Sequence, residues 1–438
     1  MTSMATATAS RRTTGVAQEL ERALRPFLRP FTGGDLPVRL RAWDGSETGA
    51  GPLVELHSPQ AITRLLWNPG ELGAAQAYVA GEIDVPGDLD AALTHVRSEV
   101  SARGLTGARP GPASFARAAR TALRLGALRG RPPAPDSQAR VRGRLHGRER
   151  DRAAISHHYD FSNEFYSAVL DDHMAYSSAY WTSPEMTLEE AQAAKLDLVC
   201  RKLGLGPEKT LLDVGCGWGS LSLHAAEQFG ARVLGITIAE EQKRFIDARI
   251  AERGLGDRVE IRLCDYRDVG SISTVRYDAA ASIEMGEHVG QANYPTFVEV
   301  LHDAVRPGGR VLVQQMSRGG TGGGRHPGGG PFIEAFIAPD MTMRPVGETV
   351  DLLEAGGLEV RDVHGLREHY VRTVDAWIER FEAAEPRLRT LVPEEYLRVW
   401  RLYLVGGRMA FRDGRMGVDQ ILAVRPGAPH DLPAVRSW

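Results

Sequence analysis

The sequence contains little cysteine and no long apolar run. Its three cysteines, Cys200, Cys216 and Cys264, are too few and too scattered to form a disulfide framework or a zinc site. No apolar stretch approaches the roughly 18 residues of a membrane-spanning helix, and residues 1–14 lack the apolar core of a signal peptide. We therefore expect a cytoplasmic protein without a bound metal, with a disordered tail over residues 1–14.

An excess of charge of one sign is also missing. The chain has 53 Lys and Arg against 56 Asp and Glu, a net charge of −3, which does not favour nucleic acid as a partner. The exception is residues 101–152, where thirteen arginines are opposed by only Asp136, Glu149 and Asp151. Such a segment is attracted to anionic phospholipid headgroups, by about 1 kcal/mol for each basic residue near the surface. A solvated linker is the alternative interpretation.

The length of 438 residues favours two or three domains. Residues 15–100 are predicted to form a small α/β module that presents lipid or contacts another subunit. Its helical spacing covers residues 18–27, 60–67 and 72–81, and its strand alternation covers residues 38–43 and 53–57, joined by the turn-forming Asp44-Gly45-Ser46. A basic Arg- and Pro-rich linker over residues 101–152, with a helix at 115–128, precedes a larger domain over residues 153–438.

The larger domain is organised around a glycine-rich turn. Residues 210–214 are predicted to form a buried strand ending in Asp213-Val214, followed by Gly215, Gly217 and Gly219 and a helix over residues 220–229. Open α/β sheets bind ligands at the carboxyl ends of their strands, and glycine lets the backbone approach a ligand closely. The spacing differs from the Gly-x-Gly-x-x-Gly of dinucleotide folds. It resembles motif I of S-adenosylmethionine (SAM)-dependent methyltransferases; a glycine turn without a ligand is the alternative.

Strand and helix patterns alternate after this turn. Further strands are predicted at residues 233–238, 259–263, 277–283 and 309–316, with helices between them, which indicates a parallel doubly wound sheet. Two later strands, at residues 358–364 and 417–425, are expected to pair antiparallel at one edge. The fold class is therefore α/β, with a mostly parallel seven-stranded sheet of the SAM-methyltransferase type and a small N-terminal α/β module.

Several segments together resemble the cyclopropane-fatty-acyl-phospholipid synthase family. They are His158-Tyr159-Asp160, residues 174–181, the glycine motif, Glu287-His288-Val289-Gly290 and His369-Tyr370. The resemblance covers roughly residues 153–426. It implies a SAM-dependent methyltransferase that acts on the cis double bond of an unsaturated acyl chain in a phospholipid.

The resemblance also implies which residues hold the cofactor. Seven positions match SAM-binding positions of the family, and the neighbouring Asp213, Gly219, Ile238, Asp265 and Tyr266 complete the expected set, the last two standing where the family has Trp-Glu near the adenine. The seven are Tyr176, Ser177, Gly215, Gly217, Thr237, Gln242 and Ile283.

Glu287 and Tyr370 match residues of a bicarbonate-binding active site, in which bicarbonate is the base. The family's active-site Cys is replaced by Ser178, and the His at the end of the fifth strand is replaced by Gln314. Both replacements can hydrogen-bond an anion, but neither supplies the cation of a protonated His. Glu287 is the alternative base if a dry pocket raises its pKa. Tyr159 is among the aromatic candidates for steadying a cation.

The order of the chemical steps decides the product. Attack of the alkene on the methyl group leaves a carbocation; immediate proton loss from the new methyl closes a cyclopropane, whereas a hydride shift first gives a methylene group, which a separate reductase converts to a methyl branch. The altered base site favours the methylene product, with the cyclopropane as the alternative. Expected partners are unsaturated phospholipid at the inner face of the membrane, a reductase and a second copy of the chain. A methyltransferase of soluble small molecules and an inactive lipid-binding protein are the remaining alternatives.

Overall fold

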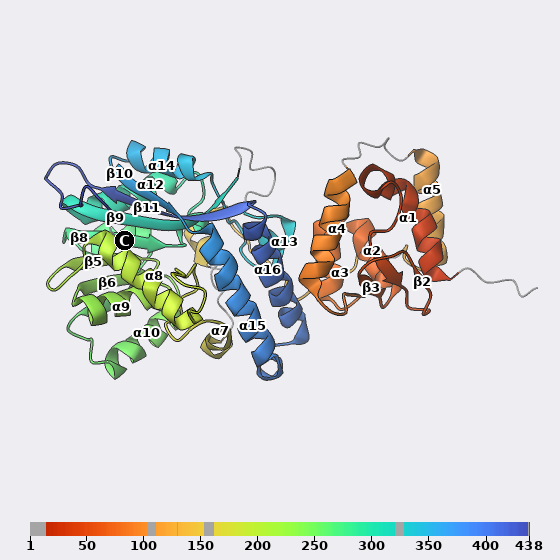
Figure 1. Cartoon of the computed structure of the whole chain (residues 1–438), viewed down its shortest axis with the longest axis horizontal. Coiled ribbons are helices and arrows are strands. Elements are labelled where there is room, and N and C mark those ends of the chain that lie inside the picture. The colour runs from red at the N-terminus through yellow and green to blue at the C-terminus, as the bar shows by residue number, and fades with distance from the viewer. Residues whose placement is uncertain (1–14, 104–110, 129, 153–161, 320–327, 437) are drawn as a thin grey trace, which may run out of the picture. The chain divides into compact units, whose positions relative to one another are not determined.

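The computed structural model describes residues 15–103, 111–128, 130–152, 162–319, 328–436 and 438 (Figure 1). The predicted tail and Tyr159 lie outside these residues. The chain divides into two compact units, Met1–Pro135 and Asp136–Trp438. The division falls inside the segment 101–152 that the sequence presents as one linker. Within the described residues, each helix is too short or too polar to cross a bilayer.

The first unit is a four-stranded sheet with helices, in the strand order β2-β1-β3-β4. Its small core contains Leu20, Leu40, Leu56, Ala61 and Ala77. In chain order the elements are α1 (Val16–Thr32), β1 (Arg39–Arg41), β2 (Glu47–Thr48), β3 (Leu53–Leu56), α2 (Pro59–Trp67), α3 (Glu71–Val79), β4 (Ile83–Asp84), α4 (Leu89–Arg103) and α5 (Pro112–Arg124).

The predicted connection between the two strands of this unit is wrong. The turn at Asp44 leads from β1 into the short strand β2, which pairs antiparallel with β1, whereas β3 pairs parallel with β1. The Asp44 carboxylate closes the turn by accepting hydrogen bonds from the backbone N and the hydroxyl of Ser46. Two residues are too few to show strand alternation, so the sequence pattern missed β2.

Helix α5 lies against α1 in the first unit (Figure 1). The rings of Phe27 and Phe115 meet edge to face at 5.0 Å, and the Thr63 hydroxyl donates to the carbonyl of Ala127 at 2.8 Å. Part of the predicted linker is thus packed structure of the first unit.

The second unit contains the predicted seven-stranded sheet, in the order β10-β11-β9-β8-β5-β6-β7. Strand β11 pairs antiparallel with both β9 and β10, and the other pairs are parallel. This confirms the mostly parallel doubly wound fold. The strands are β5 (Thr210–Val214), β6 (Arg232–Thr237), β7 (Val259–Leu263), β8 (Tyr277–Ile283), β9 (Val305–Arg318), β10 (Glu359–Gly365) and β11 (Met416–Val424).

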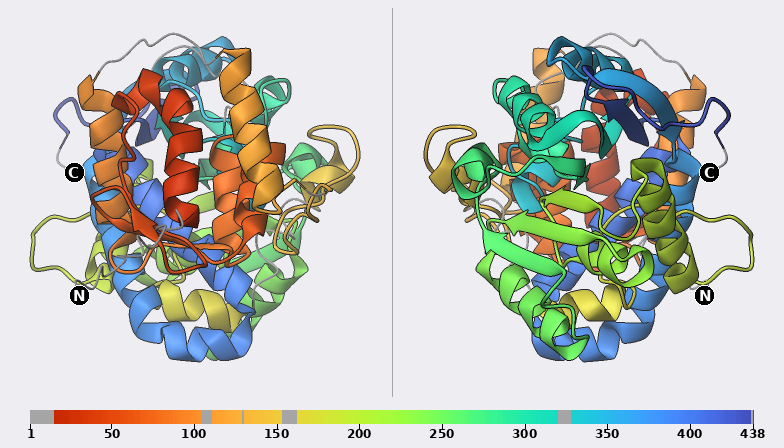
Figure 2. Two further views of the ribbon diagram at one scale, coloured as in Figure 1. Left: turned by 90° about the vertical axis from the view of Figure 1, so that its right-hand side faces the viewer. Right: turned by 90° about the vertical axis from the view of Figure 1, so that its left-hand side faces the viewer.

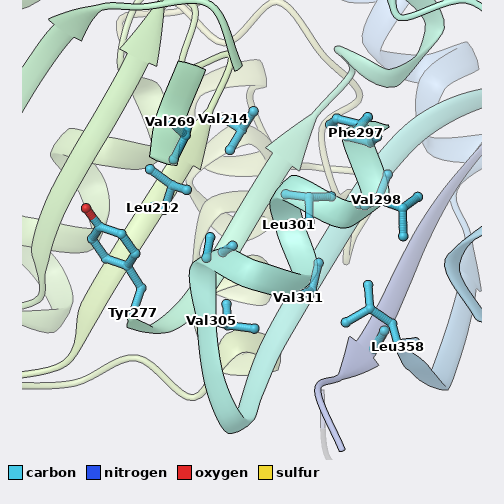
Figure 3. Packing of buried hydrophobic residues seen from close by; sticks show 14 of the residues in the cluster. Leu212, Val214, Val269, Tyr277, Phe297, Val298, Leu301, Val305, Val311 and Leu358 are labelled. Carbon is cyan, nitrogen blue, oxygen red and sulfur yellow. The ribbon is translucent and has the colours of Figure 1, made fainter. Parts of the chain in front are cut away.

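Helices cover both faces of this sheet (Figures 1 and 2). One face is covered by α8 (Leu188–Leu203), α9 (Ser220–Phe229) and α10 (Glu240–Glu252), and the other by α11 (Val269–Ile272), α12 (Tyr294–Ala304) and α14 (Val346–Ala355). Because both faces are covered, successive residues of β5 are buried on opposite sides: Leu212 and Val214 join the α12 side (Figure 3), and Leu211 joins the α8 side.

The remaining helices build an aromatic cluster beside the sheet. Helices α7 (Asn163–Val169), α15 (Arg367–Leu391) and α16 (Glu394–Arg412) pack around the buried rings of Tyr166, Trp377 and Trp400. Short helical segments η1 (Tyr266–Asp268), η2 (Gly286–His288) and α13 (Pro331–Phe336) follow β7, β8 and β9. The cluster places Tyr370 of α15 near the carboxyl ends of the central strands.

Candidate functional site

A cavity opens at the carboxyl ends of β5, β6 and β8, where the fold predicts ligand binding. Its lining includes all of the predicted cofactor residues except Gly219. They are Tyr176, Ser177, Asp213, Gly215, Gly217, Thr237, Ile238, Gln242, Asp265, Tyr266 and Ile283. Residues from five separate stretches of the sequence therefore meet at one site.

Gly215 and Gly219 of the turn are required to be glycine for different structural reasons. Gly215 lines the cavity with a φ of +78°, and a Cβ there would lie 2.7 Å from Cγ of Met285. Gly219 has a φ of +82°, and its Cβ would lie 2.9 Å from Cγ2 of Ile246 in α10. Gly215 therefore makes room for the Met285 side chain at the cavity wall, whereas Gly219 lets α9 and α10 pack closely.

Buried polar groups line the cofactor side of the cavity. The Ser222 hydroxyl donates to Asp213 at 2.6 Å, and burial raises the pKa of this carboxyl to about 6. Lys195 donates to the Ser177 hydroxyl at 2.8 Å, and burial lowers the pKa of its ammonium to about 8. The Thr237 hydroxyl donates to Gln242. Lys195 belongs to no sequence motif and was missed for that reason.

Asp265 lines the cavity but is already paired. Arg267 donates to both of its carboxylate oxygens, at 2.7 and 2.6 Å, and also reaches Asp151 at 2.9 Å. Asp151 lines the same cavity. An adenine amine at Asp265, as the sequence suggests, would share this carboxylate with Arg267.

The segment around Asp151 is tied to the rim of the cavity. Arg148 makes two hydrogen bonds to Asp268, and Arg150 makes two to Asp340. Because these two arginines of the predicted basic linker pair with acids of the second unit, they are not free to attract lipid headgroups.

Three of the predicted catalytic residues meet at a carboxylate that the sequence reasoning missed. Glu284 accepts hydrogen bonds from the backbone N of Ser178 at 2.9 Å, from Nε2 of Gln314 at 2.8 Å and from the hydroxyl of Tyr370 at 2.7 Å. Glu284 lines the cavity, and these three residues are not among its lining. It follows β8 directly, so its position at the carboxyl end of a parallel strand was the available signal.

Ser178 acts through its backbone. Its hydroxyl donates to the carbonyl of Ala179, and only its amide reaches Glu284. Gln314 is held in place because its Oε1 accepts from Gln420 at 2.9 Å. In this arrangement the Ser178 hydroxyl, which the sequence suggests as an anion ligand, donates to a backbone carbonyl instead.

Glu287 lies near Glu284 but has different hydrogen-bond partners. One of its carboxylate oxygens accepts a hydrogen bond from the backbone N of Met316, and among the described residues the other oxygen has no partner. Burial and the nearby Glu284 raise the pKa of Glu287 to about 8. The residue is absent from the cavity lining, and no hydrogen bond joins it to Tyr370 in the described part of the chain. The Tyr370 hydroxyl donates its hydrogen bond to Glu284.

The environment of Glu284 combines opposing effects on its charge. The pKa of its carboxyl is raised, chiefly by burial, and the donors at Ser178, Tyr370 and Gln314 and the charge of Lys195 offset only part of this rise. Its φ of +51° lies in the left-handed region, which costs a residue with a side chain on the order of 1–3 kcal/mol.

Over the described ranges, no group of three or more His, Cys, Asp or Glu residues is arranged to hold a metal.

The chain is similar to several known proteins. Residues 146–421 match the family model described as mycolic acid cyclopropane synthetase. A probable fatty acid methyltransferase of Pseudomonas putida is 38% identical over 92% of this chain and 95% of its own length. A tuberculostearic acid methyltransferase of Mycobacterium tuberculosis is 34% identical over 91% of this chain and 90% of its own length.

A solved structure shares the fold of the second unit. The mycolic acid cyclopropane synthase CmaA1, solved in complex with SAH and CTAB, has a TM-score of 0.57 and 30% identity. The match covers 63% of this chain and 98% of that protein.

Proposed function

The chain belongs to the mycolic acid cyclopropane synthetase family and is a SAM-dependent methyltransferase acting on fatty acyl chains, and from this premise we propose its reaction. The enzyme transfers a methyl group to the cis double bond of an unsaturated acyl chain of a phospholipid. The product is a methylene-branched chain, formed through a carbocation.

One observation carries the proposal: a single cavity joins the predicted cofactor residues to a buried carboxylate. Its walls are mostly apolar at Met174, Ile236, Ile283, Met285 and Val289. An alkene is a weak nucleophile and must be aligned at about 3–3.5 Å from the methyl group. A carbocation in turn has to be kept from water. A cavity with apolar walls beside the cofactor residues meets both requirements.

The cavity residues suit SAM as the cofactor. Gly215 and Gly217 leave room for it, Asp213, Thr237 and Gln242 offer polar contacts, and Tyr266 offers a ring face. Bound SAM supplies a methyl group on a positively charged sulfur. Because no metal is needed for this transfer, the chain's own groups have three tasks: to orient the acyl chain, to exclude water and to accept a proton.

Aromatic rings beside the cavity suit a cationic intermediate. Tyr176 lines the cavity, and its hydroxyl donates to Tyr403 at 3.0 Å. Its ring lies 5.4 Å from that of Trp377 and 6.1 Å from that of Trp400. A ring face stabilises a nearby cation by ~0.5–2 kcal/mol. We assign this role to Tyr176, in addition to Tyr159, which the structure does not describe.

The names of the relatives support a methyl branch over a ring. The two relatives described above each match more than nine-tenths of this chain and are named methyltransferases, whereas the cyclopropane synthase structure matches 63% of it. We therefore retain the methylene product, which a reductase then converts to the methyl branch. The cyclopropane is the second candidate.

The first unit offers a surface for the lipid. Helix α5 carries Arg117, Arg120 and Arg124 and no acidic residue, and its Phe115 and Leu123 are 58% and 64% exposed. The adjoining α1 exposes Phe31. Arginines beside exposed apolar side chains suit an anionic membrane surface. We propose peripheral attachment of the enzyme to the inner face of the membrane through α1 and α5, with a second copy of the chain as a further partner.

The test is product analysis with the full chain, SAM and vesicles that contain a cis-monounsaturated phospholipid. Mass spectrometry and NMR of the released acyl chains should show a gain of one carbon as an exocyclic methylene group. A cyclopropane as sole product overturns the methylene assignment. Methylation of soluble acceptors without any dependence on vesicles overturns the lipid assignment.

A further inference from the structure

We infer that Glu284 is the proton acceptor of this reaction, and that its carboxylate fills the place that a bound bicarbonate would otherwise take. This inference rests on the proposed function, because it names the base for that reaction. It makes the enzyme independent of bicarbonate.

The donors around Glu284 form a site for an anion. They come from three different parts of the second unit: the Ser178 backbone before α8, the Gln314 side chain on β9 and the Tyr370 hydroxyl on α15. All three residues occupy positions at which the family resemblance places the bicarbonate site. Since each of them already donates to Glu284, the protein's own carboxylate takes up the hydrogen bonds that a small anion would need.

Glu284 is also placed to react. Oε1 accepts two hydrogen bonds, from Ser178 and Gln314, whereas Oε2 accepts one, from Tyr370. A carboxylate oxygen can accept more than one donor, so Oε2 keeps a lone pair for a proton. Among the described residues with these contacts, Glu284 is the one that lines the cavity.

The chemical step balances with no further reactant. After methyl transfer and the hydride shift, a C–H bond of the new methyl group breaks and its proton goes to Oε2 of Glu284. The electron pair of that bond becomes the second bond of the methylene group, which neutralises the carbocation. The resulting carboxylic acid returns its proton to solvent when the product leaves.

The backbone at Glu284 supports a functional role. Its φ of +51° is unusual for a residue with a side chain, and its N–H donates to the carbonyl of Gln314 at 2.6 Å. Strained residues of this kind persist where the surroundings fix them and are concentrated at active sites. A glycine at this position would relieve the strain and leave the three donors free.

The three donors that a glycine in place of Glu284 would leave free give a direct test of the inference. In buffer freed of carbon dioxide, the unmodified enzyme should form SAH at full rate with SAM and unsaturated phospholipid vesicles, and added bicarbonate should change nothing. Glu284→Gly should lose at least a hundredfold in turnover and regain at least tenfold when bicarbonate is added. Glu284→Gln should lose as much and regain nothing, because the amide still fills the site.

A binding measurement accompanies the activity. Carbon-13 NMR should detect saturable binding of labelled bicarbonate to Glu284→Gly and none to the unmodified enzyme. Titration calorimetry with SAH checks that each variant has kept its cofactor site. The matched control is Glu208→Gly, because Glu208 also has a positive φ, +64°, yet its side chain is 80% exposed and pairs with Arg232 at the surface. This control should behave as the unmodified enzyme in every assay.

Three results would each overturn the inference: turnover of the unmodified enzyme that requires bicarbonate, full activity of Glu284→Gly without it, or no bicarbonate binding by that variant. If the unmodified enzyme turns over no unsaturated lipid, the proposed function fails instead. The NMR comparison then still decides whether the Glu284 carboxylate occupies an anion site.

Discussion

Two buried glutamates, three residues apart after the same strand, differ in almost everything except burial. Glu284 has both oxygens hydrogen-bonded by three donors and lines the cavity. Glu287 has one donor, a second oxygen without a partner among the described residues, and a pKa raised to about 8. Burial raises the pKa of both carboxyls, but at Glu284 three donors and the charge of Lys195 offset part of the rise. We infer that such donors, and not burial alone, suit a carboxylate to act as a base.

The largest expected effect comes from exchanging each glutamate for glutamine. Glu284→Gln should lower kcat by about 10²–10⁴, the usual contribution of a positioned acid or base. Glu287→Gln should lower it far less, since Glu287 is protonated at neutral pH and the amide resembles the neutral acid. Steady-state SAH formation at pH 7 checks both variants.

Titration calorimetry with SAH is the control for this pair of variants, because both should still bind it. The opposite order, with Glu287→Gln inactive and Glu284→Gln active, would return the role of base to Glu287, the alternative base considered from the sequence.

Removing one of the three hydrogen-bond donors to Glu284 should have a smaller effect on activity and tests the same contrast between Glu284 and Glu287. Tyr370→Phe deletes the hydrogen bond to Oε2 of Glu284, and a hydrogen bond to a charged group is worth about 1.5–3 kcal/mol. The pKa of Glu284 should therefore rise in this variant, because the Tyr370 hydrogen bond lowers it in the unmodified protein. Activity should fall at neutral pH and recover as the pH is raised.

The pH–rate profile measures this directly: its acid limb should move to higher pH in Tyr370→Phe. An unshifted limb with a uniformly lower rate would mean that Tyr370 has a different task. In Tyr370→Phe we expect the pKa of Glu284 to change more than that of Glu287, because Tyr370 donates its hydrogen bond to Glu284.

The raised pKa of Glu287 should make the free energy of unfolding depend on pH. The ordinary value is 4.5, which applies to the unfolded chain, and the folded value is about 8. Below pH 4.5 Glu287 is protonated in both the folded and the unfolded chain, and its contribution to the stability of the fold is fully present. Between these values only the unfolded chain releases its proton, so stability falls as the pH rises, by at most about 1.4 kcal/mol per unit.

Denaturant unfolding at pH 5.5 and 7.5 tests this effect. Glu287→Gln should flatten the decline, because glutamine does not titrate, and should be the more stable protein at the higher pH. An equal decline in both proteins would show that Glu287 is ionised in the folded state. Glu284→Gln should flatten the decline less, because three donors offset part of the rise that burial gives the pKa of Glu284.

The sequence predicted that the glycine turn and the other proposed cofactor residues come together, as they do in the lining of one cavity, but it predicted the surroundings of Glu284 only in part. Gly215 and its neighbours belong to one local pattern, and the strand after which they come fixes their place in any sheet of this type. Glu284 belongs to no such pattern, because its donors come together only when β9 and α15 meet β8 in space. The turn after β1 was misassigned for a related reason: a two-residue strand such as β2 carries no periodicity.

Ser178 shows most clearly what the sequence alone could not predict, and its substitution has the smallest expected effect on kcat. The sequence shows a hydroxyl at the position of a family cysteine, but the group that reaches Glu284 is the backbone N–H, which every residue except proline possesses. Ser178→Ala should therefore change kcat by less than about twofold, since it removes only the bond to the carbonyl of Ala179, worth about 0.5–1.5 kcal/mol of stability. Turnover and the thermal midpoint measured together separate the two effects. A loss of kcat as large as that of Tyr370→Phe would mean that the hydroxyl, not the amide, serves the carboxylate during the reaction.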